Sequence, residues 1–187
     1  HALVWGGPLM TGAPRLAARA AARVGAGLTT VCVPQAVWPV YAASLTSIMV
    51  HPLVGEGPNQ WQGGLQTLLG DARLSAVLIG PGALGGTHPG GLKALVLTVL
   101  ASGRPVVLDA DALSVFQDDP SLLFAAIAGH GRPVVITPHD GEFARIFAPS
   151  TLAGCEGKLA KARKAAQLSV TNGSCQRRES WCRRSAI

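Results

Sequence analysis

The chain has 187 residues, of which 48% are hydrophobic and only 14% charged, so a disordered chain is excluded and one domain with a buried core is expected. The net charge of +6 does not indicate a nucleic-acid-binding protein, because eight of the 16 Lys and Arg residues lie in 158–187 and the rest of the chain is nearly neutral. The four cysteines form no C-x-x-C pair and no apolar stretch is long enough to span a membrane, so we expect no metal site, no membrane contact and a cytoplasmic location.

Short apolar runs rich in β-branched residues alternate along the chain with segments of helical spacing. The runs predict buried strands at 2–5, 28–33, 76–79, 105–108 and 133–136. The helical segments are 14–24, 37–45, 63–69, 91–102, 113–116 with 121–128, 141–147 and 158–168. This alternation predicts an α/β fold, a three-layer αβα sandwich around a mainly parallel sheet. In the last helix we expect Leu159, Ala162, Ala166 and Leu168 to face the core.

The first predicted strand runs into a glycine-rich loop and then into an alanine-rich helix. Gly6, Gly7 and Gly12 have no side chain, so the backbone can approach a ligand closely, and the free N–H groups near Pro14 favour an anion. The spacing matches neither a Walker loop nor a dinucleotide fingerprint. A plain strand-to-helix turn is therefore an open alternative.

Two further turns follow predicted strands. Residues 79–86 read IGPGALGG, which can enclose a flat ring or a phosphate, although a tight surface loop would have the same composition. Residues 106–113 read VVLDADAL and place two carboxylates at a strand end. Asp111 can be explained as a cap of the next helix. Asp109 lies deeper and is suited to orient a Mg²⁺-bound water or a substrate hydroxyl.

The strongest local signal is VVITPHDGEFARIF at 134–147. Pro138 restricts the turn, and we expect His139 to project over the carboxyl edge of the sheet as a hydrogen-bond donor or acid–base group. Glu142 falls in the first turn of the next helix, where a negative charge is favoured. A lone histidine is usually structural, but its position between a proline and an acidic cluster favours a functional role. Since the carboxyl ends of parallel strands meet at one edge, these turns predict one shared site.

Taken in order, the motifs resemble those of the ADP-dependent NAD(P)H-hydrate dehydratases. They are GAPRLAARAAARVGAGL at 12–28, MVHPL at 49–53, GPG at 80–82, PVVLDADAL at 105–113 and TPHDGEFARIF at 137–147. The resemblance covers residues 1–170 with the motifs in the right order and spacing. It implies a ribokinase-like fold and a repair reaction, in which hydrated (S)-NADHX or NADPHX is dehydrated to NADH or NADPH at the expense of ADP. In that scheme the ring hydroxyl is phosphorylated and phosphate then leaves.

The resemblance also implies a site. Its substrate-binding residues would be Gly12, Ala13, Gly82, Asp109, His139 and Glu142. Asp109 and Glu142 are implied as second contacts or as ligands of metal-bound water, with no metal held by the protein directly. ADP (or ATP) and Mg²⁺ would be the cofactors. The family also implies a homo-oligomer and an N-terminal epimerase domain in the full-length protein.

Two family motifs are absent from the sequence: a KG[AS] phosphate loop and the Gly-Ser-Gly-Asp turn that carries the catalytic Asp. No catalytic residue is therefore identified, and we expect 1–170 to be a dehydratase domain that is incomplete at its C-terminus and inactive alone.

Residues 171–187 have no periodicity and are predicted to be a disordered or frameshifted basic tail. Two alternatives stay open, a vitamin-precursor kinase of the same superfold and a non-catalytic dinucleotide-binding remnant, although TPHxGE with LDADAL favours the dehydratase over the kinase.

Overall fold

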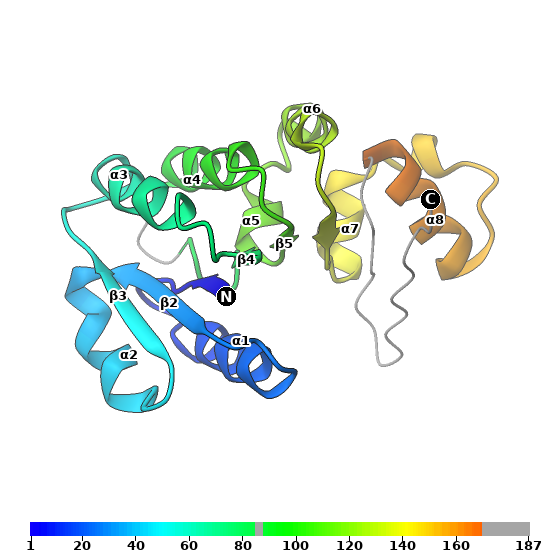
Figure 1. Cartoon of the computed structure of the whole chain (residues 1–187). Coiled ribbons are helices and arrows are strands. Elements are labelled where there is room, and N and C mark those ends of the chain that lie inside the picture. The colour runs from blue at the N-terminus through cyan, green and yellow to red at the C-terminus, as the bar shows by residue number, and fades with distance from the viewer. Residues whose placement is uncertain (85–87, 170–187) are drawn as a thin grey trace.

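The computed structural model describes residues 1–84 and 88–169, and within them a parallel sheet of six strands lies between helices (Figure 1). The strands are β1 Ala2–Trp5, β2 Thr29–Pro34, β3 Met49–Leu53, β4 Ala76–Ile79, β5 Val106–Leu108 and β6 Val134–Ile136. The helices are α1 Gly12–Arg23, α2 Trp38–Ser44, α3 Pro58–Leu69, α4 Pro89–Ala101, α5 Asp111–Ser114, α6 Pro120–His130, α7 Asp140–Ile146 and α8 Gly157–Ser169, with short 3₁₀ turns at Gln35–Val37 and Pro149–Leu152. The predicted α/β class is confirmed.

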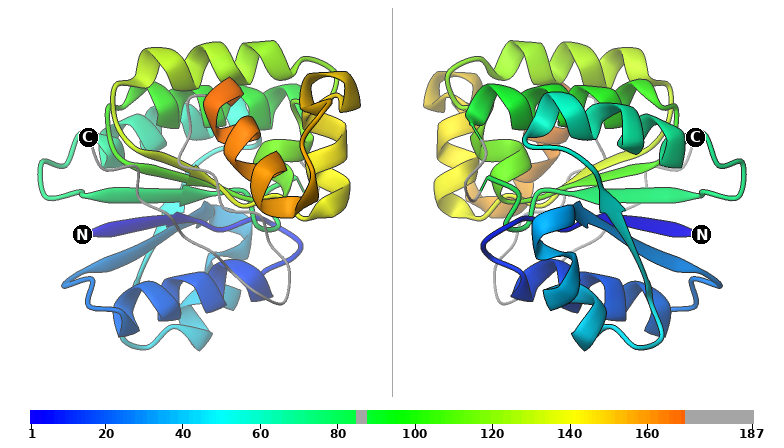
Figure 2. Two further views of the ribbon diagram at one scale, coloured as in Figure 1. Left: turned by 90° about the vertical axis from the view of Figure 1, so that its right-hand side faces the viewer. Right: turned by 90° about the vertical axis from the view of Figure 1, so that its left-hand side faces the viewer.

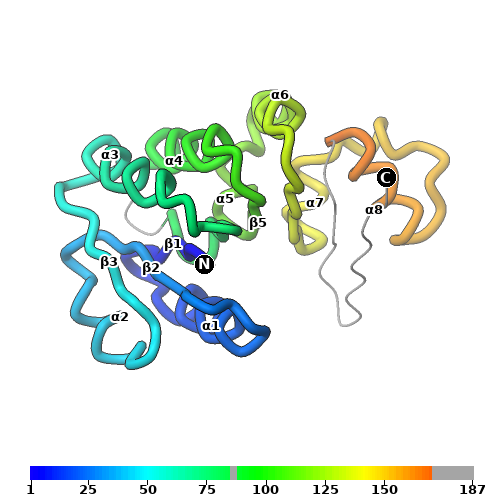
Figure 3. Tube along the Cα trace, viewed as in Figure 1, coloured from blue at the N-terminus to red at the C-terminus, as the bar shows by residue number. Residues whose placement is uncertain are grey.

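The strand order is β3-β2-β1-β4-β5-β6, and every neighbouring pair is parallel. The chain therefore moves outward from β1 to β3, returns to place β4 beside β1, and then moves outward in the other direction (Figure 3). The connection that leaves β1 leads to β2 on one side, and the connection that leaves β4 leads to β5 on the other side. A crevice at the carboxyl ends of such a strand pair is where open α/β sheets bind their ligands.

The two faces of the sheet are covered unequally. Helices α3, α4 and α6 lie along one face, and their apolar side chains form the larger core with those of the strands (Figure 2). Helices α1 and α2 lie on the other face, where Ala18 and Tyr41 pack against Val4, Val31 and Val33. The predicted three layers are thus present, and the sheet is their middle layer.

A row of aliphatic side chains on the sheet face that carries α1 and α2 shows how far this helical layer extends. In register from edge to edge, the row is Val50, Val31, Val4, Leu78, Val107 and Val135. Val31 and Val4 are buried, whereas Leu78, Val107 and Val135 are only half-buried. The described helices of this face lie over β1, β2 and β3 (Figure 2), so the half of the face formed by β4, β5 and β6 has less cover.

Three details differ from the sequence prediction. The strand β3 was not predicted, because His51 and Pro52 interrupt its apolar pattern; it is an edge strand, where a proline is tolerated. Helices α3, α4 and α6 begin at a proline in the first helical position, earlier than predicted for α3 in particular. The predicted core face of α8 is wrong, since Leu159 is 53% exposed and the buried residues are Ala165 and Ser169.

The small residues of α8 explain that error. Helix α8 packs against α6, and the residues that it buries are the small Ala165 and Ser169, whereas Leu159 and Leu168 are exposed. None of the helices in the described ranges is long and apolar enough to cross a membrane. The tail predicted at 171–187 lies outside the described residues.

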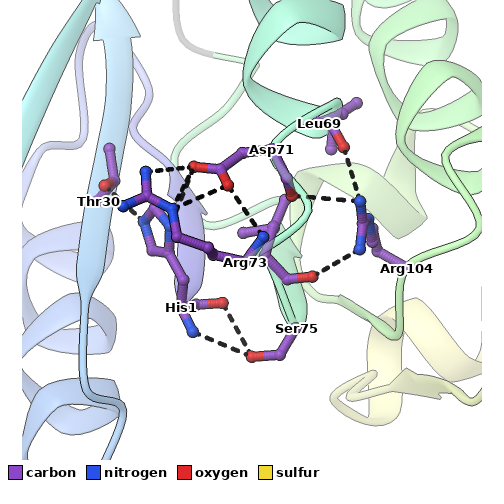
Figure 4. Close-up of polar contacts among 8 residues, drawn as sticks. His1, Thr30, Leu69, Asp71, Arg73, Ser75 and Arg104 are labelled. Atoms are coloured by element: carbon purple, nitrogen blue, oxygen red, sulfur yellow. Dashed lines mark hydrogen bonds and ion pairs between the residues drawn. The ribbon is translucent and has the colours of Figure 1, made fainter.

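A polar cluster joins the elements at the amino ends of the strands (Figure 4). The Arg104 guanidinium donates to the carbonyls of Leu74 at 2.9 Å and Asp71 at 3.2 Å, in the turn after α3. The Asp71 carboxylate accepts three hydrogen bonds from the Arg73 guanidinium, at 2.7, 3.0 and 3.2 Å. The cluster fixes the α3–β4 turn to the loop before β5, on the edge of the sheet opposite the crevice.

Acid should weaken this cluster. Hydrogen bonds from Arg73 lower the pKa of Asp71 from an ordinary 3.8 to about 2. Because the folded pKa is the lower one, the contribution of Asp71 to stability is present above pH 3.8 and is lost as the pH falls towards 2. We expect the difference in unfolding free energy between the natural chain and Asp71→Asn to be present at neutral pH and to vanish across that window. Urea unfolding at a series of pH values measures it, and a pH-independent difference would contradict the assignment.

Candidate functional site

The candidate site is built from the turns that follow β1, β4, β5 and β6. All four turns leave the carboxyl edge of the sheet, because the strands are parallel. The turn after β1 leads into α1, whose N-terminal residue Gly12 is exposed, as is Ala13. Thr11 occupies the N-cap position without a side-chain bond to the helix, so the first N–H groups of α1 have no side-chain cap.

The turns after β1 and β4 touch at backbone level. A Cβ atom added to Gly7 would lie 1.5 Å from the carbonyl oxygen of Gly82, so only glycine fits there. Gly82 has a φ of +68°, and a Cβ added to it would lie 2.5 Å from the carbonyl oxygen of Met10. The glycines of the first turn thus allow the loops that follow β1 and β4 to pack closely at the carboxyl edge of the sheet. This packing brings Gly82 next to the segment that precedes Gly12.

The turn after β5 is tied to its neighbours on both sides. The Asp109 carboxylate accepts a hydrogen bond from the Thr137 hydroxyl at 2.7 Å, which connects it to the turn after β6. The Asp111 carboxylate accepts a bond from the backbone N–H of Leu84 at 2.9 Å, which connects it to the turn after β4. Ala110, between the two carboxylates, has a φ of +48°, an unfavourable conformation for alanine.

These contacts correct one interpretation of the sequence. Asp111 is the first residue of α5 and makes no cap bond to it, since the N-cap position belongs to Ala110. The carboxylate of Asp111 instead fixes the glycine-rich turn after β4. Asp109 lies in the same turn, half-buried, with one carboxylate oxygen held by Thr137.

His139 and Glu142 form a capping box at the start of α7. The His139 Nδ1 atom accepts bonds from the N–H groups of Gly141 at 3.0 Å and Glu142 at 3.4 Å, and the Glu142 carboxylate accepts one from the His139 N–H at 2.9 Å. With Nδ1 as an acceptor, the proton of a neutral ring is on Nε2, which lies 3.2 Å from Glu142 Oε1. Glu142 is thus buried with partners, whereas the His139 side chain is 58% exposed. The ring caps α7, and its contact with a substrate stays a prediction.

The cap can be separated from any role in binding. His139→Ala should lower the free energy of unfolding by about 1 kcal/mol, because the cap of α7 is lost and the buried Glu142 carboxylate loses its contact with the His139 Nε2 atom. His139→Asn should recover most of that stability, since asparagine is a favoured N-cap residue. Denaturant unfolding of the natural chain and the two variants measures these free energies. Equal stabilities of the alanine and asparagine variants would contradict the capping role.

The structure brings the predicted site residues together in two groups. Asp109, His139 and Glu142 are grouped through Thr137, the first residue of the TPH turn, whose hydroxyl donates to Asp109. Gly82 lies against Met10, near the start of α1 with its Gly12 and Ala13. Gly80 joins the groups, since a Cβ added to it would lie 1.7 Å from the Asp109 carbonyl oxygen.

Sequence reasoning missed two members of this arrangement. Thr137 was part of the quoted TPH motif but was given no role, although its place directly after a strand could have suggested one. The Tyr41 hydroxyl donates to the carbonyl of Gly7 at 2.8 Å from α2, a contact across 34 positions that no sequence pattern signals. Among the described residues, no group of three His, Cys, Asp or Glu side chains could hold a metal ion.

Comparisons with known proteins identify the family of the chain. The family model described as NAD(P)H-hydrate dehydratase matches residues 2–171. A bifunctional NAD(P)H-hydrate repair enzyme from Salinibacter ruber is 35% identical over 176 residues, which are 88% of this chain and 29% of the relative. The ADP/ATP-dependent NAD(P)H-hydrate dehydratase of Bacillus subtilis, co-crystallised with ATP and Mg²⁺, has a TM-score of 0.65 at 26% identity over 96% of this chain and 58% of that one.

The fold itself is also found in a ribokinase-like superfamily protein from Enterococcus faecalis, with a TM-score of 0.64 at 22% identity over 93% of this chain and 55% of that one. The predicted ribokinase-like fold is therefore confirmed. The chain spans less than a third of the length of the repair enzyme and somewhat more than half of each solved structure.

Proposed function

The chain belongs to the NAD(P)H-hydrate dehydratase family, and we propose that it supplies the dinucleotide-binding part of an enzyme that dehydrates (S)-NADHX and NADPHX to NADH and NADPH at the expense of ADP or ATP. The observation that carries the proposal is the joining of four turns along the carboxyl edge of the sheet, from β1 through β4 and β5 to β6. Three of these turns hold the residues that the family motifs assign to the dinucleotide, and the fourth holds Asp109. The substrate-binding residues of the proposal are Gly12, Ala13, Gly82, Asp109, His139 and Glu142.

The chemistry assigned to the site is the removal of a ring hydroxyl. A hydroxyl becomes a leaving group once it carries a phosphoryl group, and the loss of phosphate together with a proton from the neighbouring ring carbon then restores the nicotinamide double bond. In the proposal the glycine-rich turns bring backbone close to the dinucleotide, and Asp109 orients the reacting hydroxyl or a water bound to Mg²⁺. The described residues hold no cluster of ligands for a metal, so Mg²⁺ would enter with the nucleotide phosphates.

Phosphoryl transfer also needs groups that this sequence does not contain. The Gly-Ser-Gly-Asp turn expected of the family is absent from residues 1–187, and with it the Asp and the N–H groups that would hold the transferred phosphoryl. The half-covered face at Leu78, Val107 and Val135 supports the idea that further polypeptide packs on this sheet, because parallel sheets are normally covered on both faces. We therefore propose that this chain binds the dinucleotide but catalyses its repair only together with such polypeptide. A homo-oligomer, an epimerase partner domain and a cytoplasmic location are parts of the same proposal.

Binding distinguishes the dehydratase from the vitamin-precursor kinase. We expect NADPH, the product, to bind saturably when the purified chain is titrated and the fluorescence of the reduced nicotinamide is followed. A vitamin-precursor alcohol such as pyridoxine should not compete. Binding of the alcohol to the chain, with no binding of NADPH, would contradict the dehydratase and favour the kinase.

A further inference from the structure

Tyr41 reaches the candidate site from a helix that contributes nothing else to it. Its side chain is fully buried on α2, and its hydroxyl donates to the Gly7 carbonyl at 2.8 Å. It is the only tyrosine in the sequence. The contact joins the α1 and α2 layer to the turn at the crevice between β1 and β4.

The aromatic ring of Tyr41 supports the residue before Gly7. A Cβ atom added to Gly6 would lie 2.9 Å from the ring carbon Cζ of Tyr41 and 2.5 Å from Cγ1 of Val33. The Gly6 backbone therefore lies directly against the ring. Ring and hydroxyl together hold two consecutive residues of the turn after β1, one by packing and the other by a hydrogen bond.

The position of Gly7 in turn determines the position of the neighbouring turn. Gly7 packs on the Gly82 carbonyl, and Gly82 packs on Met10, so the two glycine-rich turns contact each other through backbone atoms alone. Backbone atoms in such contact cannot adjust by rotating a side chain. A shift of the Gly7 peptide would therefore displace residues 80–84 as well, and with them the turn held by Asp111.

The hydroxyl acts as a fixed donor rather than as an acid or base. Burial raises the pKa of Tyr41 to about 12, and the positive charge of Arg15 offsets this only in part. The group is therefore neutral at every pH at which an enzyme of this kind would work. The Gly7 carbonyl accepts and cannot donate, so the hydroxyl proton points at it.

We infer that Tyr41 is a positioning residue of the dinucleotide site, which holds the Gly7 peptide so that residues 6–11 and 80–84 present their backbone to the ligand in one arrangement. This inference rests on the proposed function, because the ligand is taken to be the dinucleotide. A tyrosine that only satisfied its own buried hydroxyl would contribute to stability and leave ligand affinity unchanged.

Tyr41→Phe keeps the ring and removes the hydroxyl. Its matched control is Ser169→Ala, which removes another buried hydroxyl that donates to a backbone carbonyl, that of Ala165 at 2.8 Å within α8. We expect the Kd for NADPH to rise about tenfold in Tyr41→Phe, the worth of one hydrogen bond, and to stay within about twofold in Ser169→Ala. An unchanged Kd in Tyr41→Phe, or an equal rise in both variants, would overturn the inference.

A second measurement needs no ligand. Amide hydrogen exchange of the free chain should be faster over residues 6–11 and 80–84 in Tyr41→Phe and unchanged there in Ser169→Ala. Unchanged exchange in Tyr41→Phe would overturn the inference whatever the ligand is. Faster exchange in a chain whose natural form does not bind NADPH would instead refute the proposed function and leave Tyr41 as a residue that orders the two turns.

Discussion

Replacing Gly7 by alanine is expected to destabilise the chain by at least about 3 kcal/mol, which lowers the melting temperature by about 6–12 °C in a domain of this size. The new Cβ would lie 1.5 Å from the carbonyl oxygen of Gly82, a backbone atom that no side-chain rotation can move. The turns after β1 and β4 would have to separate, and the bond from Tyr41 to the Gly7 carbonyl would be strained with them. Thermal unfolding followed by circular dichroism measures the effect.

The matched control is Gly12→Ala in the same loop-to-helix segment. A Cβ at Gly12 meets nothing within 4 Å, and the residue is already the first of α1, so stability should stay the same or rise slightly. NADPH binding should nevertheless weaken, since the proposed site needs close backbone approach at Gly12. A Gly7→Ala chain as stable as Gly12→Ala would show that the two turns do not pack as the structure has them.

The second large effect concerns the layer of helices over β5 and β6. Leu123→Ala should cost about 3 kcal/mol, because Leu123 is fully buried in the main core and its truncation leaves a cavity between α6 and the sheet. The corresponding fall in melting temperature is about 6–12 °C. Denaturant unfolding, analysed at constant m-value, gives the free energy directly.

Its neighbour Leu122 is the control on the same helix. Leu122 is 41% exposed, so Leu122→Ala removes little buried surface and should change stability by less than about 1 kcal/mol. The pair therefore tests the orientation of α6 independently of helix propensity, which is the same in both substitutions. Similar losses of unfolding free energy in Leu122→Ala and Leu123→Ala would mean that α6 does not pack through the face that carries Leu123.

The sequence predicted the local elements well where the pattern had one physical explanation. Continuous β-branched runs ended by Gly or Pro are hard to place anywhere but in buried parallel strands, and all five such predictions are strands in the structure. The strand at Met49–Leu53 was missed because an edge strand does not need a continuous apolar run. The predicted face of α8 was wrong because the helix buries Ala165 and Ser169 rather than its leucines, and which face is buried depends on the elements packed around it.

The sequence predicted which turns form the candidate site, but not the contacts between those turns. The turns that follow parallel strands lie at the same edge of the sheet, so the sequence alone predicted that Asp109 and His139 belong to one site. The strand order that puts β4 beside β1 is a tertiary property, and so is the contact of Gly7 with Gly82. The capping role of His139 was not expected because histidine is not among the usual N-cap residues.

We propose that this chain carries the dinucleotide half of a hydrate-repair site. The most direct test is the recovery of NADH absorbance from hydrated NADH with Mg²⁺ and either ADP or ATP. It should be run on this chain and on a version extended at its C-terminus with the part of the Bacillus subtilis dehydratase that this chain does not cover. We predict recovery by the extended protein and none by the chain alone; a folded extended protein that fails to restore NADH would contradict the claim.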